Sequence, residues 1–476
     1  MLFNSYEFLI FFPIVLFVFF LVPGRFQKIC LLAANYIFYL SAGIRFGMFL
    51  IAATAITYAG GLLLSCFEKK SARKCILALS ILFTLSFLLY FKYSPWIYSL
   101  FGNDTISLVM PLGVSFYTFQ SMTYLIDCYR KKIPTEKSFS DYALFVSFFP
   151  CILSGPIERA GNLLPSLKVT KHFDPIRAKE GLVLMLWGYF LKIVIVSRLS
   201  ILTDLVFKNY TDYSGANILI ATIAFAIQIY CDFAGYSGIA IGAARILGFS
   251  VMDNFHQPYF AENVADFWRR WHISLTSWFR DYLYIPLGGN RHGAFRKYCN
   301  IMIVFLTSGL WHGANLTFLI WGALNGLYQI IGALLQPLRD KCSGQLCLKK
   351  LPALSHILSV SVTFLLICFS WIFFKADTLS DACAIISRIL HNFHAADLIN
   401  GSIFSLGLGH VNLIFVIAAI MILWFVDRKL EKTKQPLFQL LTHTPLLLRW
   451  SIYYLLICMI LLSCNLSTQE FLYMQF

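Results

Sequence analysis

Charged residues are scarce in this sequence. Asp, Glu, Lys and Arg make up only 13% of its 476 residues, whereas soluble globular domains carry about 25%. Hydrophobic residues make up 59%. A water-soluble fold of this size could not bury so much apolar surface, but a lipid bilayer can accept it when the backbone is helical. The composition therefore predicts an all-α integral membrane protein.

Several short enzyme motifs are also absent. The sequence contains no GxSxG, HExxH, Walker A or GxGxxG pattern. Its 13 cysteines are scattered, most of them within apolar runs, and they include no CxxC pair. We therefore expect the cysteines to be small packing residues, with no disulfide and no metal centre.

The basic residues that are present lie in short clusters between the hydrophobic runs. The net charge of +15 would suit a nucleic-acid partner, but this arrangement is the one that the positive-inside rule gives to a membrane protein. We therefore expect membrane lipids, and no nucleic acid, as partners of these clusters. Clusters follow the first, third and fifth hydrophobic runs, so the ends of these runs are expected on the cytoplasmic side. The N-terminus is then expected on the opposite, outer side of the membrane.

The hydrophobic runs predict about 11 to 13 spans and re-entrant helices in a single transmembrane domain, 1–476. No repeat or low-complexity linker divides the chain, and Glu7 and Pro23 around the first run argue for a retained helix over a cleaved signal. Some runs are shorter than the ~20 residues of a straight span, so re-entrant or tilted segments are expected. The runs are 8–22, 29–43, 46–67, 75–91, 106–127, 141–155, 181–197, 216–234, 299–311, 314–335, 354–374, 411–426 and 445–464.

The segment 251–297 differs from the rest of the chain because it interleaves arginine and histidine with tryptophan and tyrosine. It is too polar to lie in lipid and too aromatic for a solvated loop. Such a segment suits the headgroup level of the membrane, where arginine can meet phosphates. A surface anchor of amphipathic helices, without any chemistry, explains the composition equally well.

His312 is the most conspicuous ionisable residue. It lies in the run 298–338, which contains no Asp, Glu, Lys or Arg. Ionisable residues in such surroundings are costly and are therefore candidates for a functional site. Gly309 and Gly313 flank it, and small residues let another backbone or a substrate approach closely. The alternative is a histidine that only bonds a neighbouring carbonyl in helix packing.

His272 is a second candidate. If its segment is helical, Trp268 and His272 share one face at the spacing i, i+4. A neutral imidazole can take a proton from an attacking hydroxyl. The alternative is a polar residue at the membrane interface, and only the fold can bring His272 to His312.

Two further sets of residues carry weaker signals. His391, His394 and Asp397 have a spacing that metal ligands can have, but a solvated loop between spans explains them better. Asp232 places a carboxylate among apolar residues, as a proton relay or, more simply, as the ion-pair partner of a buried arginine.

Two stretches resemble the motifs of the bacterial membrane-bound O-acyltransferases. The first lies within 267–291 and reads FWRRWHISL followed by WFRDYLYIPLGGNR, and the second, 309–314, reads GLWHGA. The segments 3–8 and 153–159 are also similar to that family, so the likeness extends over most of the chain. The loop 285–291 is similar to the branch that acetylates alginate, other exopolysaccharides or peptidoglycan.

The resemblance implies a helical enzyme with a central tunnel, with His312 near its centre and His272 close by. It implies no bound cofactor and a donor, acetyl-CoA or another acyl thioester, that approaches from the cytoplasm. The acceptor would be a hydroxyl of an extracytoplasmic polysaccharide, reached directly, through a relay tyrosine, or through an extracytoplasmic acyltransferase partner protein. The protein would lie in the bacterial cytoplasmic membrane, with 251–297 as a catalytic segment on the cytoplasmic side.

The aromatic C-terminal tail, 465–476, adds a candidate relay. Related systems have similar tails in which a tyrosine carries the acyl group, so the resemblance implies this role for Tyr473. A phenol has a pKa of about 10 and needs a base to act as a nucleophile. An interfacial aromatic anchor is the alternative.

We therefore expect His312 to act as general base, His272 to assist, and Arg269, Arg270 and Arg291 to hold donor phosphates or lipid headgroups. Three alternatives stay open at the level of sequence. They are D-alanyl transfer toward teichoic acid, a transporter or flippase that relays protons, and a scaffold without activity.

Overall fold

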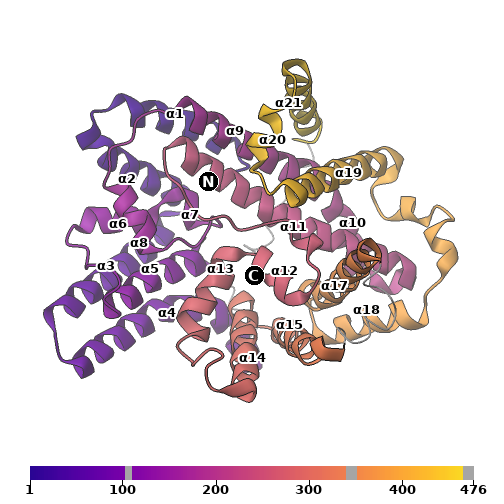
Figure 1. Ribbon diagram of the computed structural model, residues 1–476, viewed down its shortest axis with the longest axis horizontal. Coiled ribbons are helices and arrows are strands. Elements are labelled where there is room, and N and C mark those ends of the chain that lie inside the picture. Colours follow the sequence, from indigo (N-terminus) through magenta and orange to yellow (C-terminus); the bar gives the residue numbers. More distant parts are fainter. Residues whose placement is uncertain (102–109, 339–350, 465–476) are drawn as a thin grey trace. The chain divides into compact units, whose positions relative to one another are not determined.

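The structure is a computed structural model that describes residues 1–101, 110–338 and 351–464 (Figure 1). Within these ranges the regular elements are helices, and no strand occurs. Seven described stretches are long and apolar enough to cross a membrane, and two shorter apolar helices accompany them. The prediction of a polytopic helical membrane protein is therefore confirmed.

The seven long stretches include one that joins three elements end to end: α9 (Pro175–Tyr189), a π-helix η1 (Phe190–Val196) and α10 (Ser197–Lys208). The shorter apolar helices are α1 (Tyr6–Leu21) and α21 (Leu446–Leu461). The other long helices are α3 (Ile44–Cys66), α4 (Lys70–Leu100), α11 (Gly215–Ile246), α15 (Leu316–Leu334), α17 (Pro352–Lys375) and α19 (Gly409–Thr433).

One predicted span, 141–155, is not a continuous helix. It is divided at Phe148 into α6 (Phe139–Ser147) and α7 (Phe149–Ile152). Pro150 has no backbone N–H and therefore cannot continue the hydrogen bonding of α6. Asn35 stabilises the break, since its Oδ1 accepts from the Phe149 N–H at 3.0 Å.

The chain forms two compact units. The first comprises 1–189 and 235–253, and the second comprises 190–234 and the described part of 254–472. Thus α11 contributes its first part to the second unit and its last part to the first.

In the first unit, α1 packs on α2 (Gly24–Leu40), and aromatic rings fill the space around Phe3. The Phe3 ring lies 4.9 Å from the Phe8 ring and 4.9 Å from the Tyr236 ring, between centroids. The Tyr189 hydroxyl donates to the Phe3 carbonyl at 2.8 Å. The remaining helices of this unit are α5 (Val114–Tyr129) and α8 (Ala160–Leu167).

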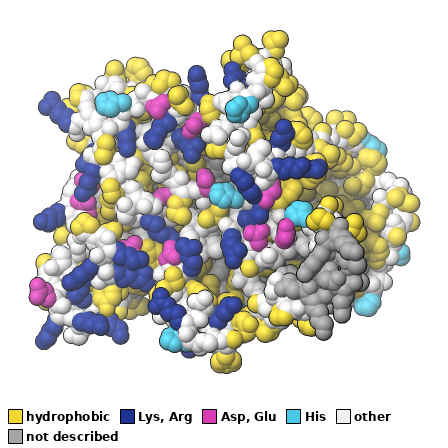
Figure 2. Space-filling model, in the orientation of Figure 1, with side chains coloured by type: hydrophobic (Ala, Val, Ile, Leu, Met, Phe, Trp, Pro, Cys, Tyr) yellow, Lys and Arg dark blue, Asp and Glu magenta, His cyan; other side chains and the backbone are white. Residues whose placement is uncertain are grey.

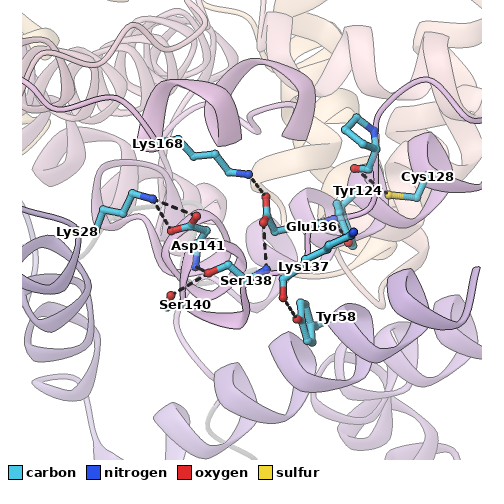
Figure 3. A network of polar contacts seen from close by, with 11 residues as sticks. Lys28, Tyr58, Tyr124, Cys128, Glu136, Lys137, Ser138, Ser140, Asp141 and Lys168 are labelled. Carbon is cyan, nitrogen blue, oxygen red and sulfur yellow. Dashed lines mark hydrogen bonds and ion pairs between the residues drawn. The ribbon is translucent and has the colours of Figure 1, made fainter. Parts of the chain in front are cut away.

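Two acidic side chains of the first unit form ion pairs with lysines (Figure 3). Asp141 accepts from Lys28 Nζ at 2.9 Å, and Glu136 pairs with Lys168 Nζ at 2.6 Å. Other Lys and Arg side chains are numerous on the face in view over α2 to α8 (Figure 2). The pairing with Lys168 holds the pKa of the Glu136 carboxyl below its usual value, against the opposing effect of burial.

In the second unit, α14 (Gly293–His312) and α15 form a tight hairpin (Figure 1). A Cβ at Gly309 would lie 2.4 Å from the Phe318 carbonyl oxygen, and one at Gly322 would lie 2.4 Å from that of Phe305. Only glycine permits this approach of two backbones. The other helices of this unit are α12 (Val264–Arg270), α13 (Ile273–Phe279), η4 (Arg280–Tyr284), α18 (Leu379–His391) and α20 (Leu437–Thr442), with 3₁₀ turns at Tyr210–Asp212, Pro258–Phe260, Ala395–Leu398 and Ser402–Ser405.

Candidate active site

His312 is the last residue of α14 and is 4% exposed. Its imidazole lies among aromatic rings from three helices. The ring centroids of Trp311, Trp321 and Phe374 are 4.8, 5.0 and 5.4 Å from that of His312. Trp321 belongs to α15 and Phe374 to α17, so the packing of the α14–α15 hairpin on α17 builds this environment.

The two glycines beside His312 face α15. A Cβ at Gly309 would collide with the Phe318 carbonyl, and a Cβ at Gly313 would lie 2.2 Å from the Phe318 ring. Of the two roles expected for them, the approach of another backbone is therefore shown at Gly309, whereas an aromatic side chain approaches Gly313. These glycines fix where α14 ends and thereby where His312 lies.

His272 lies between α12 and α13, not within a helix. The helix expected to carry Trp268 and His272 on one face ends at Arg270, so that expectation is wrong. The backbone of His272 has φ 43° and ψ 54°. This left-handed conformation is uncommon for residues other than glycine and is often found at functional sites.

Hydrogen bonds from another segment hold His272 in this conformation. The Asn254 carbonyl accepts from the Ile273 N–H at 3.0 Å, and its side-chain Oδ1 accepts from the Ser274 hydroxyl at 2.6 Å. The His256 N–H donates to the Arg270 carbonyl at 3.0 Å. The chain is thus fixed on both sides of His272, which replaces the bonds that a continuous helix would make.

The His272 side chain is buried, with 1% of its surface exposed. Its ring meets Phe233 of α11 edge-on at 4.5 Å between centroids and lies 6.2 Å from the Trp311 ring. Burial lowers the pKa of this imidazole to about 3, because the charged form loses its hydration. His272 is therefore neutral at physiological pH.

Trp311 joins the two histidines. Its ring centroid lies 4.8 Å from that of His312 and 6.2 Å from that of His272. The structure thus brings together two histidines that are forty positions apart, within one compact unit. Sequence reasoning did not single out Trp311; its position next to His312 in the GLWHGA motif was the available signal.

The three candidate arginines have different surroundings. Arg270 pairs with Asp266 at 2.9 Å and with Glu431 at 2.7 Å, so its charge is balanced within the protein. Arg269 and Arg291 are exposed. The loop before Arg291 is held by Asn300, whose Nδ2 donates to the Gly289 carbonyl at 2.8 Å.

Asp232 forms a buried ion pair with Lys192 of η1. Both side chains are almost fully buried, at 0% and 3% exposed. The ion-pair role expected for Asp232 is confirmed, although the partner is a lysine and not an arginine. Phe233, the next residue, is the one that contacts His272, so the pair anchors the same part of α11.

The remaining candidates are His391, His394 and Tyr473. His391 and His394 are exposed at the end of α18 and after it, as a solvated segment predicts. Among the residues that the structure describes, no group of three His, Cys, Asp or Glu could hold a metal ion. Tyr473 lies outside the described residues.

Comparison with known proteins decides the family. The model of the membrane-bound O-acyltransferase family matches residues 81–375. A probable alginate O-acetylase of Pseudomonas syringae is 35% identical over 425 residues, which cover 86% of this chain and 76% of the relative. This chain belongs to the membrane-bound O-acyltransferase family.

Two other relatives transfer different groups, one an acetyl group and the other a D-alanyl group. A peptidoglycan O-acetyltransferase of Helicobacter pylori is 31% identical and covers 77% of this chain and 74% of the relative. A teichoic acid D-alanyltransferase of Bacillus subtilis is 25% identical and covers 56% of this chain and 69% of the relative. The chain is therefore a multi-pass membrane O-acyltransferase, and both buried histidines lie within the region that the family model matches.

Proposed function

We propose that this protein transfers an acetyl group from acetyl-CoA to a hydroxyl of an extracytoplasmic polysaccharide, in the bacterial cytoplasmic membrane. The observation that carries the proposal is the meeting of His312 and His272 on Trp311, in a member of an acyltransferase family. Acetyl is favoured over D-alanyl because the relatives named as acetylases match more of the chain at higher identity.

In the proposed reaction His312 is the general base. It takes the proton of the acceptor hydroxyl while the hydroxyl oxygen bonds to the carbonyl carbon of the thioester. The tetrahedral intermediate then collapses and the carbon–sulfur bond breaks. The thiolate leaves and receives a proton, so the products are an acetyl ester and a thiol.

His272 is better suited to positioning than to accepting the proton. An imidazole with a pKa of about 3 is a weak base at neutral pH. A neutral imidazole can still donate one hydrogen bond and accept another. We assign it the task of orienting the reacting groups or the neighbouring Trp311 ring.

The donor carries phosphates, and Arg269 and Arg291 are the candidates to bind them. Both are exposed, and arginine matches phosphate geometry with paired donors. Arg270 is less available because two carboxylates already surround its guanidinium.

The acetyl group reaches the polysaccharide directly or through a relay. Tyr473 or an extracytoplasmic partner acyltransferase would supply the relay. A Tyr473→Phe variant separates these routes, because the phenol oxygen is lost while the ring stays. Direct transfer survives this change, whereas a tyrosine relay stops.

The function is tested with the purified protein in lipid vesicles, supplied with acetyl-CoA labelled in its acetyl group and with candidate polysaccharides. Label appearing in the polymer as an ester, with release of free thiol, supports the proposal. A D-alanyl carrier thioester serves as the competing donor. Movement of a solute across the vesicle without ester formation would instead indicate a transporter.

A further inference from the structure

Besides Trp311, three buried tryptophans, Trp268, Trp321 and Trp371, belong to the cluster of rings around His312, and their indole N–H groups differ in their hydrogen bonding. Trp268 of α12 donates its N–H to the Asn325 Oδ1 at 3.1 Å. The N–H groups of Trp321 and Trp371, each on a side chain 1% exposed, have no hydrogen-bond partner among the residues that the structure describes. Buried donors are normally paired, so two such groups side by side need an explanation.

One unpaired donor belongs to a ring that contacts His312, and the other belongs to a ring that packs behind it. The Trp321 ring stands edge-on to the His312 imidazole, at 5.0 Å between centroids and 87° between planes. Trp371 stacks on Trp321 at 5.9 Å and 20°. Trp371 also contacts Phe374, the third ring beside His312.

The side-chain amide of Asn325, which contacts Trp268, is already engaged. Asn325 lies one turn after Trp321 on α15, where its Oδ1 accepts from Trp268 and its Nδ2 donates to the Trp321 carbonyl at 2.9 Å. Asn325 therefore accepts from the Trp268 N–H, while the N–H of Trp321, the ring that contacts His312, has no acceptor among the described residues. The carbonyl oxygen of a ligand could accept a hydrogen bond from this N–H.

We propose that the indole N–H groups of Trp321 and Trp371 bind the carbonyl oxygen of the transferred acyl group. This inference rests on the proposed function and extends it. When the acceptor oxygen bonds to the carbonyl carbon and its proton passes to His312, the carbonyl π electrons move to that oxygen. The two N–H groups then stabilise the resulting oxyanion until the carbon–sulfur bond breaks.

The surroundings make these donors effective. Hydrogen bonds to developing charge are strongest where water is excluded and the donors are already oriented. Trp321 and Trp371 are held by stacking and by the packing of α15 on α17, so they need little reorganisation during the reaction. Tryptophan offers a donor and no acceptor, which suits a carbonyl oxygen.

The test compares Trp321→Phe and Trp371→Phe with Trp268→Phe as the matched control. All three keep an aromatic ring and lose one N–H. Loss of an oxyanion donor lowers kcat by about 100-fold or more, so we expect this for Trp321→Phe, a smaller loss for Trp371→Phe, and a donor KM within about twofold of wild type. Trp268→Phe should keep kcat near wild type and lower the Tm most, because it leaves Asn325 Oδ1 unpaired.

A second measurement does not depend on the variants. In protein labelled with ¹⁵N-tryptophan, the indole N–H resonance of Trp321 should move on addition of an acetyl-CoA analogue with a ketone in place of the thioester. The Trp268 resonance should stay. Unchanged Trp321 and Trp371 resonances at saturating analogue would overturn the inference.

The outcomes separate this inference from the proposed function. If wild-type protein transfers acetyl and His312→Ala does not, while both Trp321→Phe and Trp371→Phe keep wild-type kcat, only the oxyanion role is wrong. If the wild type forms no acetyl ester, the proposed function fails first. Equal losses of kcat in all three phenylalanine variants would assign the rings a packing role and overturn the inference.

Discussion

The imidazole of His272 meets the ring of Phe233 edge-on, with 4.5 Å between their centroids and 78° between their planes. Asp232, the preceding residue on α11, forms the buried ion pair with Lys192. The side chain that supports His272 and the charge that anchors α11 are therefore neighbours in sequence, and a change in the ion pair should affect the site.

Breaking the buried ion pair should be costly. Asp232→Asn removes the carboxylate that pairs with the buried Lys192 ammonium, which we expect to lower the free energy of unfolding by about 3–5 kcal/mol. Asp174→Asn is the control, since the Asp174–Arg177 pair is roughly half exposed on both sides and such pairs contribute about 0–1 kcal/mol. Thermal unfolding in detergent compares the two. Similar small losses would show that the buried pair does not anchor α11.

The left-handed backbone of His272 should govern which substitutions the site tolerates. Asn enters this region readily, whereas a β-branched residue does not, at a cost of roughly 1–2 kcal/mol. We expect His272→Asn to unfold near the wild-type temperature and His272→Val clearly below it. Both variants lack the imidazole and should lose acetyl transfer. Equal stability of the two would argue against the strained conformation.

Because His272 is buried and neutral, the free energy of unfolding should decrease as the pH falls below 6.5. The folded-state pKa of His272 is lowered to about 3 from the ordinary 6.5, so the unfolded chain binds the extra proton between these values. Its contribution to stability is complete above pH 6.5 and is lost as the pH falls, by up to about 1.4 kcal/mol per pH unit. His272→Asn should lack this dependence.

The difference between wild type and His272→Asn is the quantity to measure, by unfolding at pH 5 to 7.5. Other groups act in both proteins and cancel; one is Glu158, whose pKa burial raises to about 7. A stability difference that stays constant over this range would contradict the assignment of His272 as a buried neutral imidazole.

The α14–α15 hairpin should tolerate no side chain at Gly309. An alanine Cβ there would lie 2.4 Å from the Phe318 carbonyl oxygen, so the helices must separate, with an expected loss of about 1–3 kcal/mol and of activity through displacement of His312. Gly332→Ala is the matched control on α15, because nothing lies within 4 Å of that Cβ. It should be neutral or stabilising by about 0.5–1 kcal/mol. Comparable effects in both variants would contradict the close packing.

Much of the helix pattern could be predicted from the sequence, because lipid-facing helices need long apolar runs. Hydropathy does not record where a run is interrupted by side-chain hydrogen bonds from elsewhere. The break at Phe148 depends on Asn35, which is more than a hundred positions away, in addition to the local Pro150. The division of the long stretch 175–208 by the π-helix η1 was likewise not evident from composition.

The site was predictable in its residue types but not in its geometry. His312 stood out as an imidazole in an uncharged run, and His272 stood out in the polar, aromatic segment 251–297. The motif likeness added that the two lie close together. The backbone of His272 depends on Asn254, and the charge of Arg270 depends on Glu431, 161 positions away. The role of Trp311 between the histidines also follows only from the fold.

The central claim is that His312 takes the proton of the acceptor hydroxyl, and His312→Ala tests it most directly. The measurement is the rate of labelled acetyl transfer from acetyl-CoA by the full-length protein in lipid vesicles, with His391→Ala, an exposed histidine, as control. We predict that His312→Ala retains its fold and lowers the rate by about 10²–10⁴-fold, while His391→Ala transfers acetyl as the wild type does. A folded His312→Ala protein that transfers acetyl at the wild-type rate would contradict the account.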